Sequence, residues 1–358
     1  MTLAVTAGSA LGGALDQSWP PFVLVAGLLL IGVVAASDGF FEAIGSRLAR
    51  LPGGAAALFV SLMALVACVT VVLNLDTSVV FLTPILLHAA RRRDIPETAW
   101  LYGAVFMSNS ASLLLPGSNL TNLLVLSPYR VSGGAFLAHS WGPWLAGVVV
   151  TIAVVGAWRS GDLRSRPGAA GEIAPLRPGL GLAGIAAAAA LVVGLRNPAL
   201  PVVAVGLVAV TLQVLVVRRL VLKEILKAVS PAPIAALFVL ATVLGTLARL
   251  WSAPGHLMAA ADAWATAAIG AGSAALVNNL PSAVLLSSRP PAHPLALLIG
   301  LDLGPNLVVT GALSAVLWLR VARSEQARPS AVVYSKVGAV LVPLSMAAAM
   351  LAGGGHGL

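Results

Sequence analysis

The most informative segment of the chain is PLALLIGLDLGPNLVVTGALSAVLWL, residues 294–319. It is apolar and long enough to span a bilayer, which takes roughly 17 to 25 residues. Its middle, LDLGPN at 301–306, nevertheless holds an acid, a glycine, a proline and an asparagine. A companion segment at 98–127 is interrupted in the same way by LLLPGSN at 113–119. Because non-helical backbone at membrane depth survives only where protein or water satisfies it, both breaks are predicted to line a cavity.

The composition excludes a soluble fold. Of the 358 residues, 59% are hydrophobic and only 9% are charged, whereas soluble domains have about 25% charged residues. The net charge of +9 would suggest nucleic acid as the partner of a soluble protein. Here the basic residues sit in short loops, where they set membrane topology instead. We therefore expect a multi-pass inner-membrane protein surrounded by lipid, with no nucleic-acid partner.

Two other regions combine apolar arms with a polar middle. Residues 55–90 are interrupted by NLDTS at 74–78, and residues 258–288 by NNLPS at 278–282. Each region is long enough for two short helices, so each is predicted to be a re-entrant hairpin that returns to its side of entry.

Simple spans complete an expected all-α polytopic fold, near residues 22–38, 140–158, 180–195, 199–217, 231–250 and 335–352. The order span, hairpin, broken helix, span occurs twice. The predicted organisation is an N-terminal tail at 1–21, a first repeat at 22–158, a linker with two extra spans at 159–230 and a second repeat at 231–358.

The basic residues orient this arrangement in the membrane. If hairpins return and all other segments cross, 17 of the 21 basic residues fall on one side, and the other side receives Arg130, Arg196, Arg249 and Arg289. The rich side is then cytoplasmic and both termini lie outside. The first repeat crosses the membrane three times and the linker twice. Because this number of crossings is odd, the second repeat enters the membrane from the opposite side, which is the inverted-repeat plan of many secondary transporters.

Two acids, Asp76 and Asp302, fall in the middle of intramembrane segments. An ionised carboxylate at bilayer depth costs at least about 2.5 kcal/mol and usually faces a cavity or a partner. We therefore expect both to couple transport to protons or cations, with a structural role at the helix breaks as the alternative. Asp38 and Glu42 lie near the cytoplasmic end of the first span, where solvated anchoring is expected.

Small polar residues concentrate at the four breaks and form the expected substrate site. They are Asn74, Thr77, Ser108, Asn109, Ser110, Ser118, Asn119, Asn122, Asn278, Asn279, Asn306 and Thr310. Broken helices expose free amide and carbonyl ends, which such side chains can cap or use together with a solute.

No cofactor, metal site or catalytic residue is expected. The five histidines are not clustered, and Cys68, the single cysteine, cannot form a multi-thiolate site. The sequence has no GxxxxGK[ST] loop for ATP. Energy would come from an ion gradient or from a separate ATPase subunit.

Several motifs resemble arsenite/antimonite efflux permeases of the ArsB type, in the ion-transporter superfamily. They are SNSASLLLPGSNLTNLL (108–124), ALVNNLPSAVLLSS (275–288), LIGLDLGPNLVVTGALSAVLWLRV (298–321), NLDTSVVFLTPIL (74–86) and SDGFFEAIGSRLAR (37–50). The resemblance implies two repeats with hairpins, a homodimer and elevator-like alternating access. Two departures stand out: spans usual before the SDGFFE-like segment are missing, and Asn109 occupies a position that is often acidic.

The resemblance makes proton-coupled export of arsenite or antimonite the leading hypothesis. Arsenite at neutral pH is uncharged As(OH)3, whose hydroxyls suit Asn, Ser, Thr and backbone groups. The same superfamily contains sodium/proton antiporters and carboxylate transporters, so a sodium/proton antiporter or an organic-anion carrier is the alternative.

Two functions of other classes are disfavoured. An intramembrane aspartyl protease could use paired membrane acids, but Asp302 lies in GLD rather than a GxGD sequence. A channel is the other possibility, and uncoupled flux beyond carrier rates would be its mark. We therefore expect a transporter and not an enzyme.

Overall fold

The computed structural model describes residues 2–50, 53–129, 131–166, 168, 174–175, 179–217, 225, 231–251 and 253–354. These residues form helices and turns, with no strand among them. The predicted all-α fold class is therefore confirmed. Parts of the predicted linker at 159–230, and the last residues of the second repeat, lie outside the described residues.

The first unit holds α1 (Thr2–Ser37), α2 (Phe40–Leu48), α3 (Ala55–Leu73), α4 (Leu75–Arg92), α5 (Thr98–Ser110), α6 (Leu120–Leu126) and α7 (Gly133–Trp158). The middle of the chain holds α8 (Ser160–Leu163), α9 (Leu180–Gly194) and α10 (Ala199–Leu212). The second unit holds α12 (Pro231–Leu250), α13 (Ala253–Ala260), α14 (Ala263–Val277), α15 (Asn279–Leu286), α16 (Pro294–Leu303), α17 (Leu313–Ser324) and α18 (Ala331–Ala349).

Several helices are built to cross a bilayer. Within the described residues, four stretches are long and apolar enough to do so alone: Gly8–Ser37, Ala55–Leu73, Gly133–Trp158 and Ala331–Gly353. A further bent pair, Ile234–Leu250 with Ala253–Ala260, meets at 77°. The shorter apolar helices α9, α10, α14 and α16 add to these. The chain is accordingly a multi-pass membrane protein.

The start of the first span differs from the prediction. Residues 2–21, predicted to be a tail, are the beginning of α1, which continues through Pro20 and Pro21. Tertiary contacts hold this extension: Gln17 is buried and its Nε2 donates to the Leu124 carbonyl at 3.0 Å. Packing of this kind offsets the backbone hydrogen bonds that two prolines remove from a helix.

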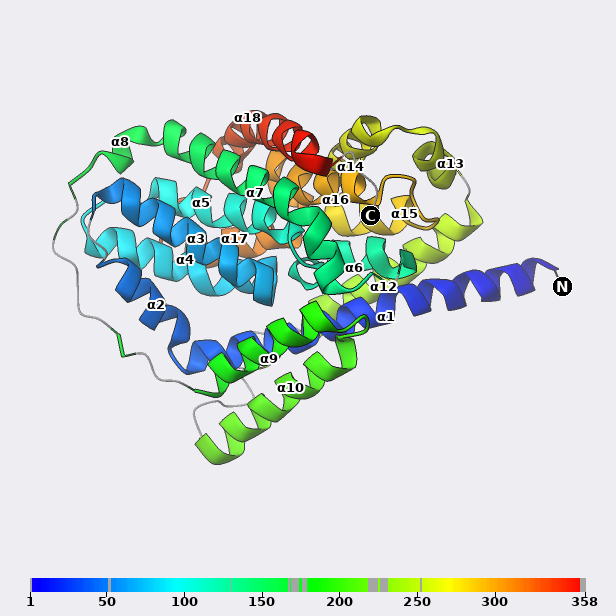
Figure 1. Cartoon of the computed structure of the whole chain (residues 1–358), viewed down its shortest axis with the longest axis horizontal. Coiled ribbons are helices and arrows are strands. Elements are labelled where there is room, and N and C mark those ends of the chain that lie inside the picture. Colours follow the sequence, from blue (N-terminus) through cyan, green and yellow to red (C-terminus); the bar gives the residue numbers. More distant parts are fainter. Residues whose placement is uncertain are drawn as a thin grey trace.

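The helices form two groups (Figure 1). α1 packs along α9, α10 and α12, and this group lies below the rest in the view. The other group contains α3, α4, α5 and α7 together with α14, α16, α17 and α18. Both predicted hairpins and both broken helices belong mainly to the second group, although α3, α4 and α6 also contact α1, and α15 contacts α12.

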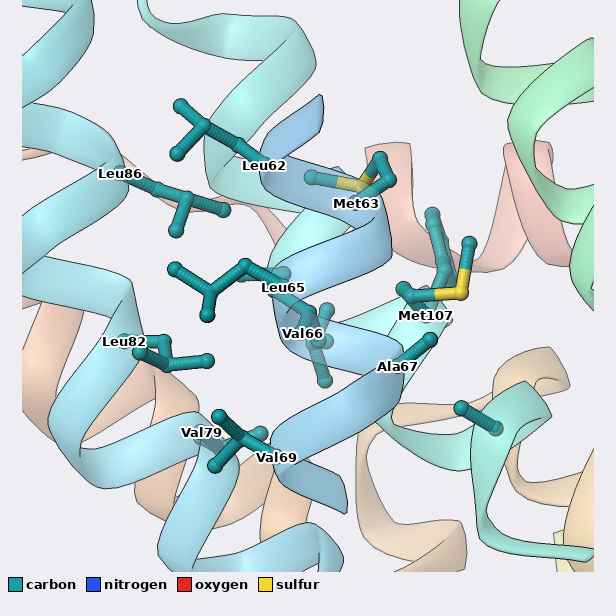
Figure 2. Packing of buried hydrophobic residues seen from close by; sticks show 14 of the residues in the cluster. Leu62, Met63, Leu65, Val66, Ala67, Val69, Val79, Leu82, Leu86 and Met107 are labelled. Atoms are coloured by element: carbon teal, nitrogen blue, oxygen red, sulfur yellow. The ribbon is translucent and has the colours of Figure 1, made fainter. Parts of the chain in front are cut away.

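The first hairpin is held by an apolar seam between α3 and α4 (Figure 2). Leu62 lies beside Leu86, and Val69 lies beside Val79, so residue numbers rise along α3 as they fall along α4. The two helices are therefore antiparallel, and the chain reverses at NLDTS as the sequence predicts. A re-entrant course through the membrane stays a prediction, since α3 alone has the 19 residues of a full span.

Both hairpins turn at an asparagine with an unusual backbone. Asn74 has φ 91° and ψ 166°, and Asn278 has φ 111° and ψ 148°. These angles lie in or near a region that is almost restricted to glycine and that costs other residues about 1–3 kcal/mol. In each hairpin the Asn side chain caps the next helix, accepting from the backbone amide of Thr77 at 2.9 Å or of Leu280 at 3.1 Å.

This geometry gives a prediction for Asn74. Asn74→Ala loses the cap and keeps the strained backbone, so we expect it to lower the free energy of unfolding by about 1–3 kcal/mol. Asn74→Gly also loses the cap but relaxes the backbone, so it should cost less. Denaturation of the purified variants in detergent measures the difference. Equal stability of the two variants would contradict the assignment.

The broken helices have breaks of equal length. Nine residues separate the end of α5 at Ser110 from the start of α6 at Leu120, and nine separate Leu303 from Leu313. The first break was predicted at 113–119 and lies at 111–119. The second begins later than LDLGPN suggests, because Pro305 restricts mainly the residue before it. Asp302 is therefore still in the last turn of α16.

In each unit, the second helix of the hairpin packs on the second half of the other unit's broken helix. α4 of the first hairpin packs on α17 of the second unit, and α15 of the second hairpin packs on α6 of the first. The last long helices of the two units, α7 and α18, also pack on each other. The contacts therefore bring both breaks into the centre of one helical group.

Candidate functional site

The two breaks meet through a pair of asparagines. Asn109, near the end of α5, donates from Nδ2 to Oδ1 of Asn306 at 2.9 Å. The Asn109 Oδ1 accepts from the Ser314 hydroxyl at 2.8 Å. Both asparagines are almost fully buried. Residues nearly 200 positions apart in sequence thus share one buried polar centre.

Asp302 and Asn119 form a second contact between the units. Asn119 Nδ2 donates to Asp302 Oδ1 at 2.7 Å, and both side chains are buried. Asn119 also caps α6, because its Oδ1 accepts from the Thr121 amide at 3.1 Å. Ser112 and Asn122 lie close to the carboxyl group. In the described part of the chain, no basic side chain forms an ion pair with Asp302.

Buried polar atoms without partners gather at the same places. Such atoms are rare in folded proteins and indicate water, an ion or a ligand. At the breaks and hairpin turns of the described chain they are Asp302 Oδ2, Asn122 Oδ1, Asn74 Nδ2, Thr77 Oγ1 and Ser282 Oγ. Every predicted break or turn therefore contains, or lies beside, a buried polar atom that has no hydrogen-bond partner among the described residues.

Other predicted site residues serve the backbone. The Ser108 hydroxyl donates to the Val105 carbonyl at 2.9 Å. Ser118 Oγ accepts from the Leu115 amide at 3.0 Å and donates to its carbonyl at 2.6 Å. The Ser110 hydroxyl accepts from Thr151 at 2.8 Å and lies 3.3 Å from Asn306 Nδ2. Hydrogen bonds to the local backbone account for Ser108 and Ser118, whereas Ser110 belongs to the buried polar centre around Asn109 and Asn306.

Asp76 is not part of the hydrogen-bonded contact between Asp302 and Asn119. It lies in the first turn of α4, is partly exposed and has no hydrogen-bond partner among the described residues. Its neighbours Asn74 and Thr77 are buried, each with an unpartnered atom. The structure therefore gives two acidic positions in separate surroundings.

The second hairpin is more open than the first. Asn278 Nδ2 donates to the Thr310 carbonyl at 2.9 Å, while the Thr310 side chain is exposed. Asn279 is buried. Val277, just before the turn, is 59% exposed, whereas Leu73 at the corresponding place in the first hairpin is 1% exposed. The two hairpins thus contribute unequally to the buried centre.

Sequence reasoning missed several contacts. Asp38, expected to be solvated, is buried and accepts from the Gly181 amide at 2.8 Å and from Gln213 Nε2 at 2.9 Å. It therefore joins α1 to α9 and α10, whereas Glu42 is exposed as expected. Thr151 lies inside the apolar helix α7 and Ser314 at the start of α17, and no sequence signal distinguished them. The polar Gln213 inside an apolar run was the available clue to Asp38.

A pocket of about 470 Å³ adjoins the first break. Its walls come from α1, α6, α9 and the start of α10, and Pro116 of the break and Arg196 are among its lining residues. The polar centre around Asp302 does not line it. The pocket lies beside the break rather than at the paired asparagines.

Comparisons with known proteins agree with this architecture. The Alcanivorax borkumensis YdaH transporter, whose crystal structure reveals an unusual topology, is 17% identical, with a TM-score of 0.57 over 96% of this chain and 86% of that chain. That identity shows the fold alone. A comparison with curated proteins found no match. The resemblance to arsenite/antimonite permeases is supported only as far as membrane transport, and the specificity for arsenite or antimonite stays a prediction.

The family model for citrate transporters (CitMHS) matches residues 2–301. The chain therefore belongs to the citrate transporter family and is a secondary transporter rather than an enzyme.

Proposed function

We propose that Asp302 holds a coupling proton or sodium ion while a small polar solute passes the two breaks. The contact between Asp302 and Asn119 carries this proposal, because it joins the two units and leaves Asp302 Oδ2 without a partner in the part of the chain that the structure describes. An uncompensated carboxylate at this depth costs at least about 2.5 kcal/mol. A bound proton or cation offsets that cost, so ion binding and the contact between the breaks are energetically linked.

Proton-coupled export of arsenite or antimonite is the leading substrate assignment. The centre offers amide and hydroxyl groups, and no basic side chain is hydrogen-bonded to Asn109, Asn119 or Asn306 in the described chain. A neutral solute with several hydroxyls, such as As(OH)3, suits these groups. A free trianion would need positive charge that they do not supply.

An organic-anion carrier is the second candidate. The citrate-transporter family favours a carboxylate solute, and helix N-termini provide anion sites through their free amides and dipoles. α4, α6 and α15 all begin at a break or turn, each capped by an asparagine. Bound cations at Asp302 and Asp76 would balance part of the anion's charge. A sodium/proton antiporter would use the same acids without an organic solute.

We further propose inverted repeats and elevator-like movement. The equal breaks, the paired asparagine turns and the exchanged contacts of the two units support this arrangement. In it, the group with the hairpins would move against α1, α9, α10 and α12, with the protein a homodimer in the inner membrane and both termini outside. Reporter fusions to each terminus test the orientation.

A transport assay decides between the solutes. Everted membrane vesicles are loaded with a proton or a sodium gradient and offered arsenite, antimonite or citrate. Gradient-driven accumulation of arsenite supports the leading assignment, and sodium-dependent citrate movement supports the second. Accumulation of neither solute, with sodium/proton exchange present, would leave the antiporter. An empty-vector membrane preparation is the control for each arm.

A further inference from the structure

A second pocket lies away from the breaks, between α2 and the end of α4. It has a volume of about 270 Å³, and its walls include Ser46 and Ala49 from α2, Ile85 and Arg92 from α4, and Arg93 just after α4. This is slightly below the roughly 300–1,000 Å³ of typical small-molecule sites. A phosphate group or a lipid headgroup is smaller than most small-molecule ligands, so a pocket of this volume can hold one.

Two arginines give this pocket its charge. Of the neighbouring side chains, Arg91 is paired with Glu97 at 2.5 Å, and His88 Nε2 lies 2.9 Å from Glu325 Oε2. Arg92 lines the pocket and has no ion pair in the described chain, and Arg93 lines it as well. Glu42 is the acid among the lining residues. The two arginines together exceed its charge.

Arg93 carries the strongest indication of a ligand. Arg93 is only 9% exposed, and one of its guanidinium nitrogens, Nη1, donates to the Ala49 carbonyl. Its Nε is buried and has no hydrogen-bond partner among the described residues. A buried guanidinium donor left free beside a pocket is suited to an oxyanion, because its N–H groups match the spacing of phosphate oxygens.

The walls of the pocket are fixed by bonds from the chain beyond α8. The Ala174 amide donates to Ser46 Oγ at 3.0 Å, and the Ala174 carbonyl accepts from Arg47 at 3.0 Å. The Gly168 amide donates to the carbonyl of Arg93 at 2.8 Å. These contacts hold α2, the end of α4 and the pocket between them in one arrangement.

We propose that this pocket binds a phosphate-type oxyanion through Arg93 and Arg92. The oxyanion is either the headgroup of an anionic phospholipid or a free phosphate, since both present the same charged oxygens. The face is the one that the basic residues predict to be cytoplasmic, where anionic lipids attract Arg and Lys. The ligand ties α2 to the hairpin helix α4, and the site is independent of the solute that the breaks carry.

Thermal unfolding of the full-length protein in nanodiscs tests the site. One arm adds inorganic phosphate to phosphatidylcholine discs against sodium chloride of equal ionic strength, and the other replaces part of the lipid with phosphatidylglycerol. We expect the melting temperature of the wild type to rise in at least one arm. Arg93→Gln should abolish the rise, and Arg92→Gln should weaken apparent affinity roughly tenfold, as expected for losing one charge-assisted contact.

Arg320→Gln is the matched control, because it removes an exposed basic residue predicted to lie on the same side, outside the pocket. It should respond like the wild type. A rise with phosphate in phosphatidylcholine discs identifies a free anion, and a rise only with phosphatidylglycerol identifies a lipid. No rise in either arm, or equal rises in the wild type and Arg92→Gln, would overturn the proposal. Arg92→Gln decides the question even if Arg93→Gln fails to fold.

Discussion

Asp302→Asn is expected to abolish gradient-driven solute accumulation while leaving the protein inserted and folded. The amide keeps the size of the side chain and can still accept from Asn119, which now donates to Asp302 Oδ1 at 2.7 Å. It cannot take up or release a proton, and it is a far weaker ligand for a cation. Removing the buried carboxylate also removes a cost of several kcal/mol for an unpaired charge, so stability should hold or rise.

The measurement compares accumulation by vesicles with and without the ion gradient. Asp16→Asn is the control, because Asp16 is an exposed acid on α1 and is not part of either break. Asp76→Asn tests whether the second acid shares the coupling role, and we expect it to lose coupling as well. Counterflow of solute without a gradient should survive in Asp302→Asn. Gradient-driven accumulation at the wild-type level in that variant contradicts the role of the residue.

Gly338→Ala is expected to damage the second break. Gly338 lies in α18, where an added Cβ would stand 1.9 Å from the backbone oxygen of Asn306. Backbone cannot rotate away as a side chain does, so α18 or the break must move. Overpacking of this kind typically costs about 1–3 kcal/mol, and displacement of Asn306 would separate it from Asn109. We therefore expect both lower stability and loss of transport.

A matched substitution isolates that clash. Gly272 lies in α14 with nothing within 4 Å of an added Cβ. Gly272→Ala should be neutral or stabilising by up to about 1 kcal/mol, because alanine is the better helix residue. Melting in detergent and solute uptake are measured for both variants. Equal behaviour of the two would show that α18 does not constrain the break.

The sequence predicted the elements that depend on local chemistry. Proline and glycine inside apolar runs indicated both broken helices, and an asparagine within a polar cluster marked each hairpin turn. The start of α1 was missed because tertiary contacts of residues such as Gln17 keep a helix going through Pro20 and Pro21. Local propensity is a weak guide where packing decides.

Pairings between distant side chains were beyond sequence reasoning. Asn109, Asn119, Asp302 and Asn306 were all expected at the site, yet nothing in one sequence indicates which of them touch. The same limit applies to Asp38, whose partners Gly181 and Gln213 lie far along the chain. Such contacts depend on how whole helices pack, and a single residue's neighbours in sequence do not encode that.

The equal breaks of nine residues bear on how a carrier of this shape would be driven. If the two units trade conformations, the outward-open and inward-open forms are assembled from equivalent joints and differ little in intrinsic free energy. A two-state equilibrium near balance responds to small biases, because each 1.4 kcal/mol shifts it about tenfold. A modest ion gradient would then suffice to set the direction of net flow, and reversing the gradient would reverse it.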